Sequence, residues 1–372
     1  MESRHVAQNH PQTVRRLDRY ILSKFIGTFF FAVAMLMMII IVFDLSENID
    51  SFLKHDAPWQ KVVTDHYLTS IPFFTNQFIH LFAFISVIFF TSKMANHSEV
   101  VAILSSGISF RRFLLPYIEG ALLLTLMSLY LANFLVPNLN EVRRKFKDEY
   151  IERLTKSAGR NIHLQTDKDE FAYVELFNVN RNLGYWFSIE RFNGNELTYK
   201  MTADVIQYDT VDNSCFVAFV TERYIDHDRE YIVNNHRIDT VFENLRPTDF
   251  YNMKEDFEEM NFFELRDHIR VMRQRGTEGI LNYEVEMNQR LAQPFAILIL
   301  TLIGASLSSR KIKGGMGMHL GFGIAIAFTY VLFAQIGKAF GVNGVLAPVV
   351  AAWIPNVIFF FIAVYFLVKA PK

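Results

Sequence analysis

Residues 94–112 read MANHSEVVAILSSGISFRR, a short polar interruption between two long apolar runs that can each cross a bilayer. Residues 94–107 predict a short amphipathic helix, because their polar and apolar side chains fall on opposite helical faces. Asn96 or Ser98 can cap its start, Gly107 can take the left-handed conformation that ends a helix, and Ser109 can cap the helix that follows. The stretch therefore predicts a helix, a tight break and then a membrane helix.

A helix that is held at both ends by membrane spans suits docking to another protein, because its movement must displace the spans. An ordinary helix in an interfacial loop is the alternative. Both interpretations place residues 94–107 at the membrane surface.

The composition indicates a membrane part and a water-exposed part in one chain. Of 372 residues, 51% are hydrophobic and 37 are Phe, yet 20% are charged. The net charge of -1 gives no reason to expect a nucleic-acid partner. The single cysteine, Cys215, permits no internal disulfide.

Six apolar runs have the length needed to cross about 30 Å of hydrocarbon. They are Phe25–Phe43, Tyr67–Phe90, Phe113–Val136, Leu291–Leu307, Met318–Ala339 and Leu346–Val368. Three precede and three follow a long polar region, so both termini are expected on one side. Basic residues gather on that side, before the first span, at residues 93–112 and after the fourth span. The positive-inside rule therefore predicts that both termini and residues 94–112 are cytoplasmic.

The polar region, residues 138–260, is then expected on the other, periplasmic side. Period-two alternation predicts half-buried strands within residues 171–177, 185–189, 197–207, 215–221 and 230–242. Turn-like sequences at Asn193-Gly194 and Asp212-Asn213-Ser214 favour an antiparallel sandwich or jelly roll over a parallel sheet.

Three parts follow from this organisation. Residues 1–137 are the N-terminal transmembrane half, residues 138–260 an inserted antiparallel β-jellyroll-like domain, and residues 261–372 the C-terminal half. The last part begins with an amphipathic helix, in which Asn261 and Glu264 have capping-box spacing and Gly276 can end the helix.

The chain carries no pattern that predicts an enzyme. It has no Walker A sequence, no paired carboxylates, no metal-ligand spacing and no nucleophile triad, so we expect no metal and no bound cofactor. Gly317 and Gly321 are interpreted as a small-xxx-small helix contact rather than as a dinucleotide loop.

Several motifs in order resemble those of one family. They are SEVVAILSSGISFRR at 98–112, YEVEMNQRLAQP at 283–294, GASLSSRKIKGGMG at 304–317, and Trp353-Ile354-Pro355-Asn356. Together with six spans and the large β insertion, they resemble the LptF/LptG family of lipopolysaccharide-export permeases. The likeness covers nearly the whole chain.

The resemblance implies a permease half that extracts lipopolysaccharide from the inner membrane of a bacterium. It implies four kinds of partner: a related permease, a cytoplasmic ATPase dimer that uses ATP, periplasmic bridge proteins, and lipopolysaccharide with membrane lipids. The ATPase contact would then use Glu99, Ile103, Leu104, Ser106, Gly107, Ser109 and Arg111. The lipid path between span one of one permease and span five of the other would use Phe29, Phe30, Met37, Phe328 and Phe333.

One feature departs from the family pattern. Some members carry basic residues toward the outer end of span one, where this chain has Asp44, Glu47 and Asp50. Lys54, Lys61 or the partner permease are the alternatives for holding lipid phosphates. A membrane sensor with a periplasmic β ligand-binding domain is the alternative function, although no output domain follows a cytoplasmic segment. A secondary transporter would show interrupted spans and midplane charges.

Overall fold

The computed structural model describes residues 11–151, 159–167, 169–178, 181–194, 196–208, 215–226, 229–240, 242, 245, 256–275, 279–310 and 315–370. The chain forms two compact units. Unit 1 comprises residues 1–146, 258–262 and 281–372, and unit 2 comprises residues 147–257 and 263–280.

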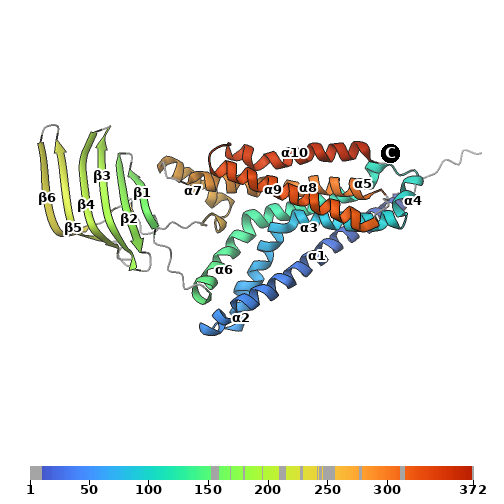
Figure 1. Cartoon of the computed structure of the whole chain (residues 1–372), viewed down its shortest axis with the longest axis horizontal. Helices are drawn as coiled ribbons and strands as arrows, with labels where there is room; N and C mark the ends of the chain where they lie inside the picture. Colours follow the sequence, from blue (N-terminus) through green and yellow to red (C-terminus); the bar gives the residue numbers. More distant parts are fainter. Residues whose placement is uncertain are drawn as a thin grey trace, which may run out of the picture. The chain divides into compact units, whose positions relative to one another are not determined.

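Unit 1 is helical (Figure 1). Its elements are α1 (Pro11–Lys54), α2 (Trp59–Lys61), a π-helical turn (Val62–Tyr67), α3 (Leu68–Asn96), α4 (Glu99–Ser105), α5 (Phe110–Tyr130), a second π-helical turn (Leu131–Leu135), α6 (Val136–Tyr150), α8 (Ile280–Ser308), α9 (Gly315–Val342) and α10 (Pro348–Lys369). Within the described residues, six helices are long and apolar enough to cross a membrane, three before and three after the β region. The predicted three-plus-three arrangement is confirmed.

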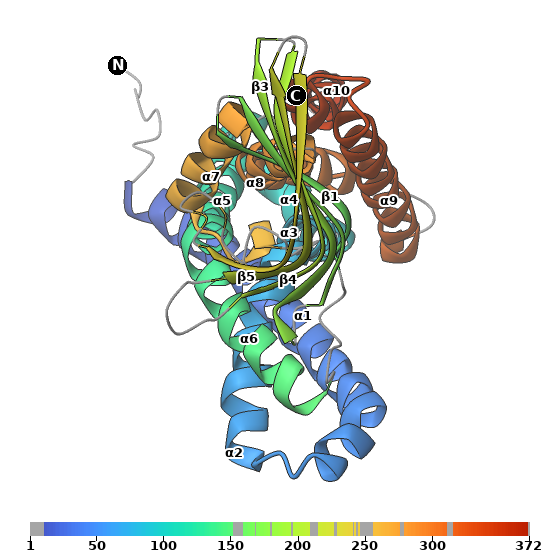
Figure 2. The same cartoon turned by 90° about the vertical axis from the view of Figure 1, so that its left-hand side faces the viewer.

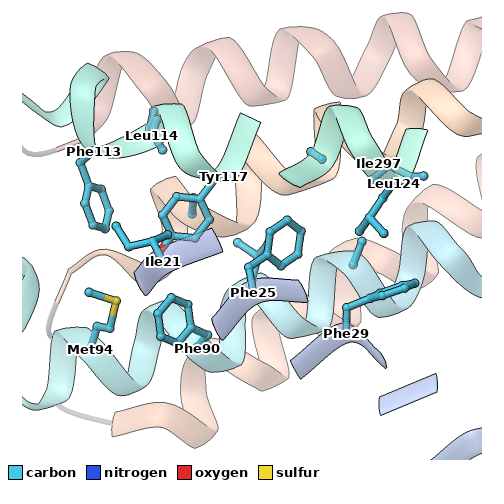
Figure 3. Close-up of a cluster of buried hydrophobic side chains, with 14 of the residues drawn as sticks. Ile21, Phe25, Phe29, Phe90, Met94, Phe113, Leu114, Tyr117, Leu124 and Ile297 are labelled. Carbon is cyan, nitrogen blue, oxygen red and sulfur yellow. The ribbon is translucent and has the colours of Figure 1, made fainter. Parts of the chain in front are cut away.

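Helices α3 and α8 are the inner helices of unit 1, and they contribute to both of its apolar core clusters. Figure 3 shows the first cluster, where Phe25 and Phe29 of α1 lie against Tyr117 and Leu124 of α5 and Ile297 of α8. The second cluster joins α3 and α8 to α9 and α10. Only 22% of the most apolar window of α1, and 22% of that of α9, is buried, so these two helices leave long apolar faces open.

Glycine permits one close backbone approach, between α9 and α10. A Cβ atom at Gly337 would lie 2.5 Å from the carbonyl oxygen of Ala351, closer than real Cβ contacts allow. Gly317 and Gly321 have open space around them instead. Among the described residues of this chain they meet no neighbouring helix, and the close α9–α10 approach lies at Gly337 instead. The small-xxx-small interpretation of Gly317 and Gly321 therefore stays a prediction for a contact with another chain.

Unit 2 contains a six-stranded antiparallel sheet whose strands pair in chain order. The strands are β1 (Gly159–Asp167), β2 (Glu170–Asn178), β3 (Leu183–Asn193), β4 (Glu196–Tyr208), β5 (Cys215–Asp226) and β6 (Arg229–Thr240). The inserted antiparallel sheet is confirmed, and β1 is a strand that the alternation pattern missed. The described strands form one sheet in which each strand pairs with the next along the chain. We expected the two packed sheets of a sandwich or jelly roll; instead, the single sheet bends back on itself (Figure 2).

The bend follows a row of residues that crosses all six strands, which we call the crease: Asn161, Glu175, Trp186, Asp204, Phe219 and His236. Along a strand every second side chain is buried, and at this row the buried positions change from odd to even numbers or the reverse. Strand β4 buries Met201 and Ala203 before the crease but Ile206 and Tyr208 after it. In a regular strand, residues i, i+2 and i+4 all lie on the same face. The uninterrupted alternation predicted for residues 197–207 is therefore wrong.

Backbone conformation accounts for the crease. Asn161, Trp186 and Phe219, on alternate strands, have φ of 53°, 55° and 55°. Each such residue interrupts the pleat of its own strand, while the pairing register stays the same on both sides of the row. The bent sheet thereby encloses a core that contains Phe177, Phe187 and Val217.

The remaining local predictions are mostly confirmed. Gly194 has φ of 65° in the turn between β3 and β4. Helix α7 (Phe262–Arg275) buries its apolar stripe of Leu265, Ile269 and Met272, as expected of an amphipathic helix. The expected turn at residues 212–214 and the expected helix end at Gly276 lie outside the described residues.

Candidate functional site

Helix α4 is the central element of the candidate site, and the break that follows it at Gly107 has the predicted form. It covers Glu99–Ser105, which is shorter than the predicted 94–107, because α3 continues to Asn96. Gly107 has φ of 91°, and its N–H donates to the carbonyl of Leu104 over 3.1 Å. The Ser109 hydroxyl caps α5 by accepting from the N–H of Arg112 over 3.4 Å. Ser98 occupies the N-cap position without a side-chain hydrogen bond.

One face of α4 belongs to the core of its own unit. Val100 is 1% exposed, and Ile103 and Leu104 pack, half-buried, against the first core cluster. Any partner would therefore touch only the outer parts of Ile103 and Leu104. Their main effect is to fix α4 on the helices beneath it.

The opposite face of α4 is open. Val101, 55% exposed, is its large apolar side chain, and Ala102 and Ser105 lie beside it. The Ser106 hydroxyl donates to the carbonyl of Ile103 over 2.7 Å, and Ser106 is itself exposed. Gly107, Ser109 and Arg111 are exposed next to this face. The sequence did not predict Val101 as part of this face, because helical spacing alone does not reveal which apolar side chains the bundle covers.

Two polar contacts join this region to α1. The Tyr20 hydroxyl donates to Glu99 Oε2 over 3.5 Å, and the Glu99 side chain remains 40% exposed. Arg112, at the start of α5, forms an ion pair with Asp18 of α1. The first helix is thus connected to both sides of the break at Gly107.

The predicted lipid-path residues fall into two groups. Phe30, Phe328 and Phe333 lie on open apolar faces, with Phe328 63% exposed. Phe29 and Met37 are buried in the first core cluster, so within this chain they face its own helices rather than an open surface. Adjacent positions separate in this way because one side of α1 packs against α3 and α5.

One carboxylate in the C-terminal part of α1, that of Asp44, contacts a buried histidine. His66 Nε2 lies 2.7 Å from Asp44 Oδ2, and the His66 ring stacks on Phe146 with its centroid 5.3 Å away. Both Asp44 and His66 line a small cavity with Met37, Tyr67 and Ser70. Glu47, Asp50, Lys54 and Lys61 are exposed.

Comparison with known proteins decides between the interpretations. The family described as lipopolysaccharide export system permease LptF/LptG matches residues 19–369. The chain belongs to the LptF/LptG family. It is therefore a permease of the lipopolysaccharide export system, a multi-pass membrane subunit without a catalytic domain.

Two curated relatives have a similar extent. The chain is 20% identical to the lipopolysaccharide export system permease protein LptG of Escherichia coli strain K12 over 361 residues, which cover 94% of this chain and 98% of that protein. The same values hold for LptG of Escherichia coli O6:H1. This LptF/LptG permease thus matches its relatives along almost their whole length, which favours the permease over the sensor.

Proposed function

We propose that this chain is one of two related permease halves that enclose a lateral path for lipopolysaccharide, with its termini and α4 in the cytoplasm. The observation that carries the proposal is the open apolar faces of α1 and α9. A helix that remains apolar all round and poorly covered needs lipid or another protein beside it. A related permease placed there would leave α1 of one half beside α9 of the other.

Helix α4 would receive the cytoplasmic ATPase dimer, which binds and hydrolyses ATP on separate chains. Glu99 offers a partly exposed carboxylate, and Val101 offers an apolar contact. The contact of Glu99 with Tyr20 and that of Arg112 with Asp18 would carry movement of α4 and of the start of α5 directly to span one.

The lipid path would be lined by Phe30, Phe328 and Phe333, whose side chains are open in this chain. Acyl chains that move sideways from the bilayer onto apolar helix faces stay out of water and break no covalent bond, so such a path needs no catalytic group. The acidic residues Glu47 and Asp50 would repel lipid phosphates. Lys54, Lys61 or the partner permease would then hold those phosphates.

The sheet of unit 2 would face the periplasm and pass lipid to the bridge proteins. Its last strand, β6, is an edge strand with Tyr231 and Ile232 exposed. An unpaired edge can be extended by a strand from another protein.

Photo-crosslinking tests the path in cells. A crosslinking amino acid at Phe30 or Phe328 should capture lipopolysaccharide when ATP is supplied. Phe361 on α10 is a matched control, because it is 67% exposed and apolar but lies outside the proposed path. If position 361 captured lipopolysaccharide as well as 30 and 328 do, the path would be wrong.

A charge reversal tests the ATPase contact. Glu99→Lys should weaken ATPase co-purification, since it replaces attraction by repulsion at a partly exposed interface, an effect of about 1–3 kcal/mol. Glu47→Lys, an exposed carboxylate in the C-terminal part of α1, should leave co-purification unchanged. Equal retention of the ATPase by both variants would exclude α4 as the contact.

A further inference from the structure

The outer face of the crease carries an aromatic side chain between two carboxylates. Glu175, Trp186 and Asp204 lie at the same level of β2, β3 and β4, because the neighbouring pairs are Val174–Phe187 and Phe187–Ala203. All three side chains are exposed, and Trp186 is 61% exposed. They line one groove of about 570 Å³, together with Tyr173, Ser188 and Lys200.

The fold by itself does not require an indole here. The crease needs a positive φ on alternate strands, and Asn161 meets that need on β1 with a residue type that tolerates this conformation. Trp186, like Phe219 on β5, adopts the same backbone conformation with a bulky side chain that stays mostly in water, and of these two only Trp186 lines the groove. A strained backbone conformation and an exposed tryptophan at one position are together typical of a binding surface.

The charge around Trp186 selects the ligand. Lys200 Nζ lies 2.7 Å from Glu190 Oε1, so the lysine of the groove is already paired, and the His163 ring packs against Tyr173 with centroids 4.6 Å apart. Among the residues that the structure describes, Glu175 and Asp204 have no ion-pair partner. The groove is therefore acidic, and it repels the phosphates of a lipid headgroup while attracting a cation.

We propose that this groove binds an arginine side chain within an extended segment of another protein. A guanidinium group is planar, stacks on an indole face and pairs with carboxylates, which matches Trp186 between Glu175 and Asp204. The groove has room for several residues around that side chain. The site is separate from β6 and does not depend on the lipid path.

Fluorescence of the full-length protein in detergent tests the site. The chain has three tryptophans, so the changes Trp59→Phe and Trp353→Phe leave Trp186 as the reporter. The probe is a Gly/Ser heptapeptide with two arginines, and its control is the same peptide with citrulline, which keeps the shape without the charge. The arginine peptide should change Trp186 fluorescence saturably, and the citrulline peptide should not.

Carboxylate variants locate the effect. Glu175→Gln combined with Asp204→Asn should weaken binding of the arginine peptide by about tenfold or more. Glu230→Gln, an exposed carboxylate outside the groove, should leave binding unchanged. Equal binding of both peptides, no binding of the arginine peptide at millimolar concentration, or quenching by a short-chain phosphate lipid instead, would each overturn the proposal.

Discussion

Glu99 of α4 accepts a hydrogen bond over 3.5 Å from the hydroxyl of Tyr20, a residue 79 positions earlier in α1. Arg112, on the far side of the Gly107 break, is paired with Asp18 of the same helix. The two contacts hold α4 and the start of α5 to the first span. Movement of α4 can therefore reach α1 without passing through the whole bundle.

The Asp18–Arg112 pair should contribute a measurable coupling energy. Asp18→Asn and Arg112→Gln should each lower the midpoint of thermal unfolding. Because the two side chains are partly exposed, 23% and 33%, we expect a coupling of about 0.5–1 kcal/mol in a double-mutant cycle. In the reconstituted complex each variant should also reduce lipid-stimulated ATP hydrolysis. Strictly additive effects in both measurements would show that the contact does not act as a pair.

Gly337 should be intolerant of any side chain. Its added Cβ would meet the Ala351 carbonyl oxygen at 2.5 Å, and a backbone atom cannot move aside cheaply. Gly337→Ala should lower the thermal midpoint of the purified permease. Gly317→Ala is the matched control in the same helix, since nothing lies within 4 Å of that position. It should be neutral or stabilising, by up to about 1 kcal/mol from helix propensity. A Gly337→Ala variant as stable as Gly317→Ala would contradict the α9–α10 packing.

Asn356 should be a stabilising polar residue in the membrane core. Its amide donates to the carbonyl of Ala292 over 2.6 Å and accepts from the Tyr330 hydroxyl over 3.0 Å, so it connects α8, α9 and α10. Asn356→Leu should cost about 1–2 kcal/mol, and Tyr330→Phe less, because only one bond is lost. Asn343→Ala, whose amide bonds only within its own helix, should have little effect. Thermal unfolding in one detergent ranks the three variants, and any other order would argue against the network.

The Cys215 thiol should react slowly with maleimide in the folded protein. Burial raises its pKa from 9.0 to about 11, so at pH 8 about a hundredfold less thiolate is present than in an unperturbed thiol. The protonated thiol is favoured by folding, so its contribution to stability is complete below about pH 9 and declines as pH rises toward 11. The rate of maleimide labelling, followed by quenching the reaction at set times before and after denaturation, measures this difference in reactivity. Comparable rates in the two states would place Cys215 at the surface.

Much of the helical half could be predicted because its signals are local. A run of about twenty apolar residues specifies a span by itself, and Gly107 and Ser109 act through their own backbone. The faces of those spans could not be predicted. Phe29 and Phe30 are equivalent in an all-apolar run, and only the packing of α3 and α5 against α1 buries the first and leaves the second open.

The crease shows why the β region was harder to predict. The row at which the buried side chains change from one alternate set to the other depends on the alignment of all six strands, which no single strand records in its sequence. The row that contains Glu175, Trp186 and Asp204 therefore reads as ordinary alternation in the sequence. The acidic groove at Trp186 emerges only when the three strands are aligned.

The parity change itself can be tested by cysteine scanning along β4 in a Cys215→Ser background. Regular alternation from buried Ala203 would bury position 205 and expose position 206. The crease reverses this, because Ile206 is 0% exposed while Val205 is partly exposed. Val205→Cys should therefore react with maleimide faster than Ile206→Cys, and Asp204→Cys should react fastest. Each rate is normalised to that of the denatured protein, and the thermal midpoint confirms that each variant is folded. Faster labelling at 206 than at 205 in folded protein would mean that β4 is a regular strand and that the sheet does not fold along the crease.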